Sequence, residues 1–213
     1  EILRCLVGSE MCIRDRLTPF VFWSRIQYYT FSTFTLFFIW LGATLFKADI
    51  PFLYTADCRY IVAAGLVTLS VMYHIIVRPG AIRTHRLNDI SYEHFSFYNY
   101  IFHYFIPVLM TADYLFFVDK TELHGHIMIS WMIYPALYVV FVYWRAWVTI
   151  VTHGTSHLYP YTFMDPRMND VFSITKGCLK VGFQFFLIGI CVYAAGKGLY
   201  LLGIPPAAWT YNG

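Results

Sequence analysis

Residues 28–46 read YYTFSTFTLFFIWLGATLF, an apolar run without a single charge. At a helical rise of about 1.5 Å per residue, about 20 such residues cross the hydrocarbon core of a bilayer. Similar runs follow, and the candidate spans are about 28–46, 60–78, 97–118, 127–151 and 181–203. The short alternating segments of barrel strands are absent from the sequence. The pattern therefore predicts an all-α protein, a polytopic transmembrane helical bundle with five spans.

The composition agrees with a membrane protein. Of the 213 residues, 59% are hydrophobic, 21% are aromatic and 13% are charged, and the mean hydropathy is +0.56. A soluble domain carries about 25% charged residues. The net charge is +3 and the basic residues form no long run, which argues against a nucleic-acid partner and leaves membrane lipids as the expected partners.

The first sixteen residues, EILRCLVGSEMCIRDR, differ from everything that follows. They lack helical periodicity and the anatomy of a signal peptide. The string CLVGSEMCIRDR also resembles the conceptual translation of a sequencing adapter. We therefore set residues 1–16 aside as non-native and treat residues 17–213 as a single transmembrane helical domain. On this interpretation the natural N-terminus is missing, and a sixth span is lost with it.

The basic residues predict an orientation. We name the end at which span 28–46 begins side B and the opposite end side A. Antiparallel threading places loops 79–96 and 152–180 on side B, and loops 47–59 and 119–126 on side A. Side B then receives Arg25, Arg78, Arg83, Arg86, Arg145, Arg167, Lys176 and Lys180, whereas side A receives Lys47, Arg59, Lys120 and Lys197. Because cytoplasmic loops are rich in Lys and Arg, we expect side B in the cytoplasm of a multi-pass protein, in the cell membrane if the source is bacterial.

Polar side chains gather toward the side B ends of the spans. Thr30 lies just inside the first span, and His103 lies about two turns inside the third, with Asn99 one turn above it on the same face. Polar groups in hydrocarbon need partners, so polar residues that recur at one depth mark a site. The loop 152–180 adds further candidates for substrate binding or support on the same side, namely His157, Tyr159, Tyr161 and Asp165.

These residue types favour acyl chemistry. A threonine hydroxyl becomes a nucleophile when an adjacent base takes its proton, and a neutral histidine is suited to that role. Asn99 is expected to orient the imidazole or to donate to an oxyanion, and no bound cofactor is required. The shallow position suits an amphiphilic substrate, whose polar ester lies near the headgroups while its acyl chains stay in the bilayer. Simpler alternatives remain, in which Thr30 bonds its own backbone and His103 and Asn99 hold neighbouring helices together.

Other positions have structural interpretations. His74 and Arg145 are expected to snorkel toward the interface, and Pro107 to bend its helix. Asp113 is expected to lie at side A or to pair with a neighbour. Tyr159 and Tyr161 also fit an interfacial aromatic belt. The Gly-Lys-Gly at 196–198 interrupts the last span.

A metal site is a further alternative. His153 and His157 would share a helical face if their loop were helical, but flanking glycine and proline oppose a rigid ligand pair. The His-Glu-x-x-His motif and the paired histidine boxes of membrane di-iron enzymes are absent from the sequence. The Gly-x-Ser-x-Gly, Walker and Gly-x-Gly-x-x-Gly motifs are absent too, which removes the common hydrolase, nucleotide and dinucleotide assignments.

The order of the motifs adds a resemblance. Tyr28-Tyr29-Thr30-Phe31 opens a span, Asn99-x-x-x-His103 precedes Pro107, Trp131 and Tyr134-Pro135 follow, and LYPYTFMD occupies 158–165. Over about residues 20–200 the chain resembles the androgen-induced membrane protein family, particularly its bacterial Pr-six-Pr branch. The resemblance implies six spans and a hydrolase of fatty acid esters of hydroxy fatty acids, with Thr30 as nucleophile and His103 as its partner.

The leading hypothesis is thus an intramembrane Thr/His hydrolase of lipid esters. The chief alternative is a non-catalytic transporter or lipid-binding bundle that uses the same polar pocket. A metal-dependent oxidoreductase is the third. The sequence makes no prediction of an oligomeric state.

Overall fold

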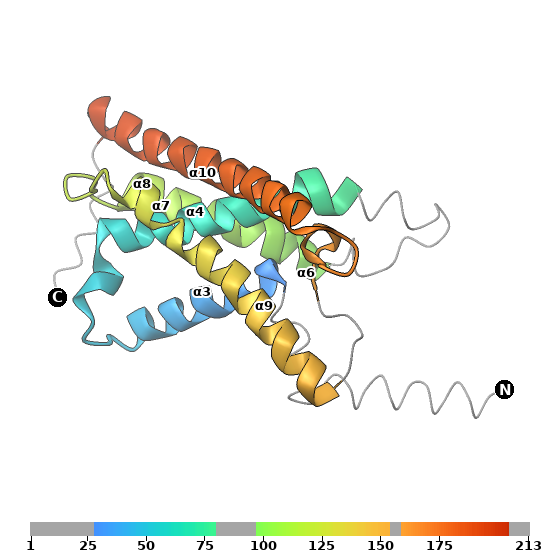
Figure 1. Ribbon diagram of the computed structural model, residues 1–213. Coiled ribbons are helices and arrows are strands. Elements are labelled where there is room, and N and C mark those ends of the chain that lie inside the picture. Colours follow the sequence, from blue (N-terminus) through green and yellow to red (C-terminus); the bar gives the residue numbers. More distant parts are fainter. Residues whose placement is uncertain (1–27, 80–96, 154–158, 205–213) are drawn as a thin grey trace.

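The computed structural model describes residues 28–79, 97–153 and 159–204 (Figure 1), so the segment 1–16 lies outside the described residues. All regular elements in the described ranges are helical. The longer ones are α3 (Tyr29–Leu45), α4 (Ala56–Met72), α7 (Ile106–Phe117), α9 (Ile133–His153) and α10 (Val171–Leu201). The shorter ones are η1 (Pro51–Tyr54), η2 (Tyr73–Val77), α6 (Phe97–Tyr100), η3 (Ile101–Phe105), α8 (Ile127–Ser130) and η4 (Thr162–Met164).

The predicted helical fold is confirmed, since each candidate span coincides with helix. Three helices in the described residues are long and apolar enough to cross a membrane, namely Ala56–Ile75, Ile127–Ile150 and Val171–Leu201. The helices Tyr29–Leu45 and Ile101–Phe117 are apolar but shorter. The protein is therefore an all-helical molecule compatible with a membrane protein, and the count of five spans stays a prediction.

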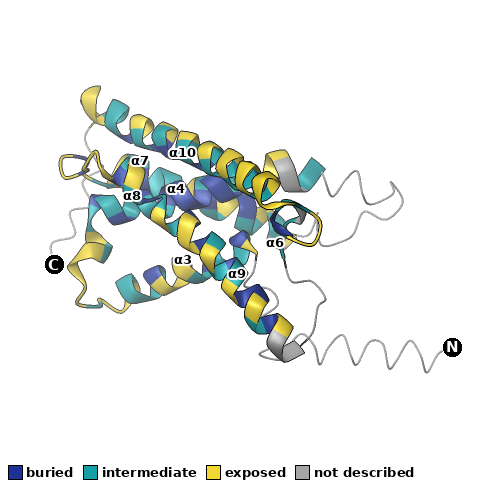
Figure 2. Cartoon of the chain, in the orientation of Figure 1, coloured by how far each residue is buried: buried dark blue, intermediate teal, exposed yellow. Residues whose placement is uncertain are grey.

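Helix α4 lies at the centre and packs against α3, α7 and α10. Figure 2 shows buried residues concentrated along it. Ala63 and Ala64 are completely buried, and Gly65 is buried beside them. Small side chains let neighbouring backbones approach closely, which is how helices in lipid gain packing energy. The helix is started by Thr55, whose side chain accepts a hydrogen bond from the Cys58 N–H at 3.2 Å.

Two glycines of helix α10 pack against large aromatic side chains of neighbouring segments. The indole of Trp131 lies against Gly189, and the phenol of Tyr114 lies against Gly196. Both aromatic side chains are almost completely buried. Positions 189 and 196 are two helical turns apart on one face, so the two glycines form a stripe that faces the bundle.

The predicted bounds of the last span are wrong at its start. Helix α10 begins at Val171, not near 181, because Asp170 forms an N-cap and accepts a hydrogen bond from the Ser173 N–H at 3.3 Å. The predicted loop 152–180 is therefore helical in its last part. The Gly-Lys-Gly at 196–198 does not interrupt the helix, since Gly196 is packed against Tyr114.

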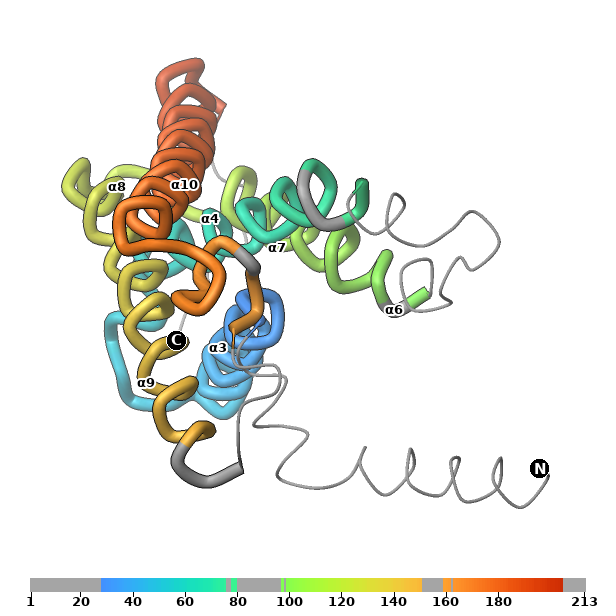
Figure 3. Tube along the Cα trace, turned by 45° about the vertical axis from the view of Figure 1, so that its right-hand side comes forward, coloured from blue at the N-terminus to red at the C-terminus, as the bar shows by residue number. Residues whose placement is uncertain are grey.

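Two π-helical turns interrupt the regular helices. η2 continues α4, and η3 precedes α7, whose first turn contains Pro107. Proline has no N–H for the regular helical hydrogen bond, which accounts for the altered turn just before it. Figure 3 shows the end of α4 and the start of the α6–α7 helix side by side. Such π turns are frequent at functional sites.

Candidate functional site

The two π turns face each other through two histidines and two tyrosines. The ring of Tyr73 stacks on His103 with a centroid distance of 3.8 Å and an interplanar angle of 24°. Nδ1 of His74 lies 2.9 Å from the Tyr104 hydroxyl oxygen. Each histidine thus contacts the tyrosine of the other turn. We name Tyr73, His74, His103 and Tyr104 the π-turn cluster.

The His103 imidazole is held in one tautomer. Its Nδ1 lies 3.1 Å from the backbone carbonyl oxygen of Asn99, and the residue is 7% exposed. Because a carbonyl only accepts, Nδ1 must carry the proton and Nε2 is the acceptor of the neutral ring. The Asn99 backbone carbonyl oxygen thus orients the imidazole, whereas the Asn99 side chain interacts with the Tyr73 hydroxyl. The roles expected for the Asn99 side chain toward the imidazole or an oxyanion stay predictions.

Thr30 is the second residue of α3 and is partly buried. Tyr28 precedes the helix and provides no side-chain cap. The Tyr161 hydroxyl lies near the backbone N–H of Tyr29. The first turn of a helix carries unpaired N–H groups and the positive end of the helix dipole. Thr30 therefore lies where negative charge on its oxygen would be stabilised.

Aromatic packing brings α3 and η3 together. The rings of Phe34 and Phe102 have a centroid distance of 4.9 Å. Phe34 is one turn beyond Thr30, and Phe102 directly precedes His103. No hydrogen bond within the described residues joins the Thr30 hydroxyl to His103. The structure therefore brings the two helices into contact without a direct bond between these side chains.

The segment 159–165 packs against α3 and α9. The Tyr161 and Tyr138 hydroxyls interact, and the Tyr143 hydroxyl donates to the Met164 carbonyl oxygen at 2.8 Å. Tyr159 packs on the Tyr143 ring at 5.5 Å. Tyr161 is thus brought beside Tyr28 and Tyr29 at the start of α3, whereas Tyr159 packs against Tyr143 further along α9.

Asp165 holds this segment in place through hydrogen bonds to Arg167. It is 6% exposed and accepts hydrogen bonds from Arg167, from Nη2 at 2.6 Å and from the backbone N–H at 2.9 Å. These bonds to the Arg167 side chain and backbone hold the pKa of the Asp165 carboxyl below its usual value. We therefore assign Asp165 a structural role, in which it holds the segment that carries Tyr159 and Tyr161.

This assignment predicts a dependence on pH. A carboxyl whose folded pKa is lowered stabilises the fold above its unfolded pKa of about 3.9, and the effect is lost as the pH falls through the lower folded pKa. Thermal unfolding midpoints of the wild type and of Asp165→Asn, measured from pH 7 to pH 3, should differ most near neutrality and converge in acid. A constant difference across this range would contradict the role.

Two predictions about charged side chains have different outcomes. Arg145 was expected to snorkel, but it is 2% exposed with the Tyr28 and Tyr138 hydroxyls nearby, so that prediction is wrong. Neighbouring residues enclose the side chain before it can reach an interface. Asp113 pairs with a neighbour as expected, and that neighbour is Arg59.

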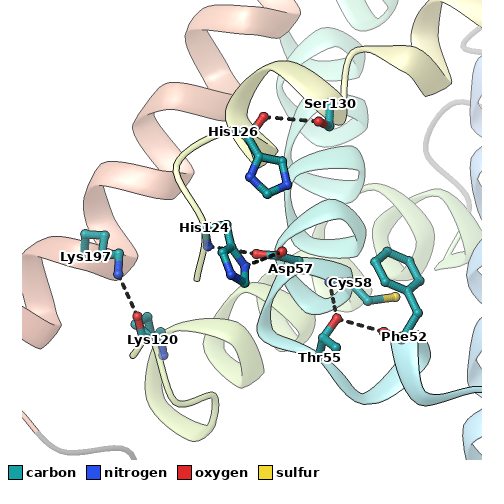
Figure 4. A network of polar contacts seen from close by, with 9 residues as sticks. All are labelled: Phe52, Thr55, Asp57, Cys58, Lys120, His124, His126, Ser130 and Lys197. Carbon is teal, nitrogen blue, oxygen red and sulfur yellow. Dashed lines mark hydrogen bonds and ion pairs between the residues drawn. The ribbon is translucent and has the colours of Figure 1, made fainter. Parts of the chain in front are cut away.

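The polar residues of side A hold the ends of helices together (Figure 4). Asp57 accepts from the His124 backbone N–H at 3.0 Å and contacts its Nδ1 at 2.9 Å. The ammonium group of Lys197 donates to the Lys120 carbonyl oxygen at 2.7 Å. These bonds tie the loop before α8 to α4 and α10, which is a structural role.

Metal ligation finds no support in the described ranges, where no group of three His, Cys, Asp or Glu side chains could hold an ion. His157, the second histidine of the predicted pair, lies outside the described residues. His153 ends α9, and its side chain is not among those described.

Tyr73, His74 and Tyr104 are site residues that the sequence did not reveal as such. The only signal was the reversed order of Tyr73-His74 and His103-Tyr104 at the same ends of two spans. The protein is thus all-helical in its described parts and compatible with a membrane location. Tyr73, His74 and Tyr104 form, together with His103, an imidazole–phenol cluster at one end of its helices. The chain matches no protein-family model, no curated protein and no solved structure.

Proposed function

We propose that this protein is a multi-pass membrane hydrolase of lipid esters in which Thr30 is the nucleophile and His103 the general base. The observation that carries the proposal is the environment of His103. The Asn99 carbonyl oxygen fixes the proton on Nδ1, and Tyr73 holds the plane of the ring. A buried, oriented imidazole with Nε2 as its acceptor is what a general base requires.

The reaction would proceed in two half-reactions. Thr30 Oγ1 forms a bond to the ester carbonyl carbon while His103 Nε2 takes the hydroxyl proton. The tetrahedral intermediate then breaks its bond to the alcohol oxygen, which receives that proton from His103. Water, deprotonated by the same Nε2, attacks the acyl-threonine and releases a fatty acid, and Thr30 regains its proton. The N–H groups in the first turn of α3 would stabilise the charge on oxygen.

The missing hydrogen bond between Thr30 and His103 in the described residues favours a second candidate. In that case the same polar residues bind lipid without catalysis, as a transporter or lipid-binding bundle. Catalytic hydrogen bonds are often long before substrate binds, so the missing bond does not exclude the hydrolase. The Phe34–Phe102 contact holds the helices of Thr30 and His103 together, and for this reason we prefer the hydrolase to the binding protein.

Covalent labelling tests the proposal. The purified protein is treated with a long-chain fluorophosphonate, and the adduct is located by mass spectrometry. We expect the adduct on Thr30 and its loss in Thr30→Ala. The control is Thr35→Ala, since the Thr35 hydroxyl is bound to the Phe31 carbonyl oxygen at 2.8 Å on the same helix. Equal labelling of Thr30→Ala, or an adduct elsewhere, would reject the hydrolase and favour binding without catalysis.

A further inference from the structure

We infer that the outward face of helix α10 binds a phospholipid of net negative charge, whose phosphate is held by Lys176 and Lys180. This inference rests on the proposed membrane location but not on ester hydrolysis. Figure 2 shows exposed residues along α10. Spacings of three and four residues place six of them on one side of the helix. We name them the outer stripe: Lys176, Lys180, Phe183, Leu187, Cys191 and Ala194.

The opposite side of the same turns faces the protein. A Cβ atom at position 177 would lie 2.8 Å from Cδ2 of Phe163, and Gly189 lies against the indole of Trp131. Phe185 is buried between these two glycines. Close packing along this inner side fixes the rotation of α10, so the outer stripe has a fixed direction away from the bundle.

The length of α10 determines the depth of its charges in a membrane. The helix carries no charge between Lys180 and Lys197. At a rise of about 1.5 Å per residue these two positions are about 26 Å apart, close to the hydrocarbon thickness of about 30 Å. The Lys197 ammonium group donates to the Lys120 carbonyl oxygen in the side A loop, so it lies at the side A boundary. Lys180 therefore lies at the side B boundary, with Lys176 one turn further out among the headgroups.

The two lysines are available to a partner. Both are exposed, and within the described residues neither ammonium group has a hydrogen bond or an ion pair. The other charges of this end have structural partners, since Asp165 pairs with Arg167 and Asp170 caps α10. Lys176 and Lys180 are four residues apart, so their side chains are neighbours on the helix surface. They form a local positive site at headgroup depth.

The outer stripe fits both parts of a phospholipid. Phe183 and Leu187 continue it into the hydrocarbon region, where an acyl chain would lie against them. The ammonium groups on their flexible stems reach the phosphate oxygens above this chain. A zwitterionic headgroup carries its own cation close to the phosphate, which offsets the attraction of the lysines. A headgroup with an uncharged alcohol has no such cation, so the site prefers the acidic lipid.

Native mass spectrometry of the full chain in detergent measures the preference. The protein is titrated with phosphatidylglycerol and with phosphatidylcholine of the same acyl chains. We expect the wild type to bind phosphatidylglycerol more tightly. Lys176→Gln/Lys180→Gln should lower this affinity by about 30-fold, at about 5-fold for each lysine, and change the affinity for phosphatidylcholine by less than about 3-fold. Lys176→Arg/Lys180→Arg should keep the preference, because arginine also binds phosphate.

Lys47→Gln is the matched control, since it removes one exposed charge from side A. It should keep the wild-type affinity for phosphatidylglycerol, whereas Lys180→Gln should lose about 5-fold. All variants should keep the wild-type unfolding temperature in lipid-free detergent. The site is overturned if Lys176→Gln/Lys180→Gln binds phosphatidylglycerol as tightly as the wild type, or if Lys47→Gln and Lys180→Gln lose equally. Fluorophosphonate labelling of Thr30 does not depend on these lysines, so failure of the lipid site and failure of the hydrolase are separate results.

Discussion

Replacing His103 by phenylalanine is expected to lower ester turnover by about 10²–10⁴-fold, the usual contribution of a general base. Phenylalanine keeps an aromatic ring on Tyr73 and keeps the site apolar, but it has no nitrogen to take the proton from Thr30. The loss should fall on kcat, because the base acts in the transition state and not in ground-state binding. Steady-state hydrolysis of a chromogenic long-chain ester in detergent micelles measures it.

Asn99→Ala is the matched control. The bond that fixes the His103 tautomer is made by the backbone carbonyl oxygen of Asn99, which alanine retains. We therefore expect Asn99→Ala to keep most of the wild-type rate. Equal and large losses in both variants would indicate damage to the whole helix end, and full activity in His103→Phe would exclude His103 as the base.

Replacing Gly189 by alanine is expected to lower the free energy of unfolding by about 1–3 kcal/mol, the usual range for overpacking a well-packed core. A Cβ atom at position 189 would lie 2.8 Å from Cε2 of Trp131, and the indole is almost completely buried, so it has no free space to move into. The shift would also disturb the bond of 3.0 Å from the Tyr60 hydroxyl to the Gly189 carbonyl oxygen. Thermal unfolding of purified protein in detergent reports the change.

Two glycines of the same helix are controls for helix propensity. A Cβ at position 182 meets only the end of Met132 at 3.9 Å, and a Cβ at position 198 meets nothing within 4 Å. Alanine favours helix over glycine by about 1 kcal/mol, so Gly182→Ala and Gly198→Ala should be neutral or stabilising. A Gly189→Ala variant as stable as these two would show that the Trp131 contact does not restrict the helix.

Hydropathy predicted the helices because each apolar run must satisfy its backbone hydrogen bonds within itself. The run 28–46 became Tyr29–Leu45, and the run 97–118 became Phe97–Phe117 with η3 inside it. The same criterion missed the first ten residues of α10, because Lys176 and Lys180 lower the hydropathy there although the Asp170 cap starts the helix. Apolar content therefore located the apolar part of a helix better than its polar end.

The candidate site was predicted only in part. His103 and Asn99 share a helical face, a relation that helical periodicity contains, and in the structure the contact between them is made by the Asn99 backbone carbonyl oxygen. The roles expected for the Asn99 side chain stay predictions. The relation of Thr30 to His103 depends on two helices far apart in the sequence, and it stays a prediction. Arg145 was misjudged for a similar reason, because its burial depends on which neighbouring side chains cover it.

The amino-acid sequence by itself determined the helical class, the approximate positions of the helices and the places of their polar residues along them, because these follow from local composition and period. Only the tertiary structure decided that Tyr73 stacks on His103 and that His74 bonds Tyr104. Those contacts require the register and rotation of two helices relative to each other. Both are set by the sum of many packing contacts along α4 and α7, and no short stretch of either helix encodes them.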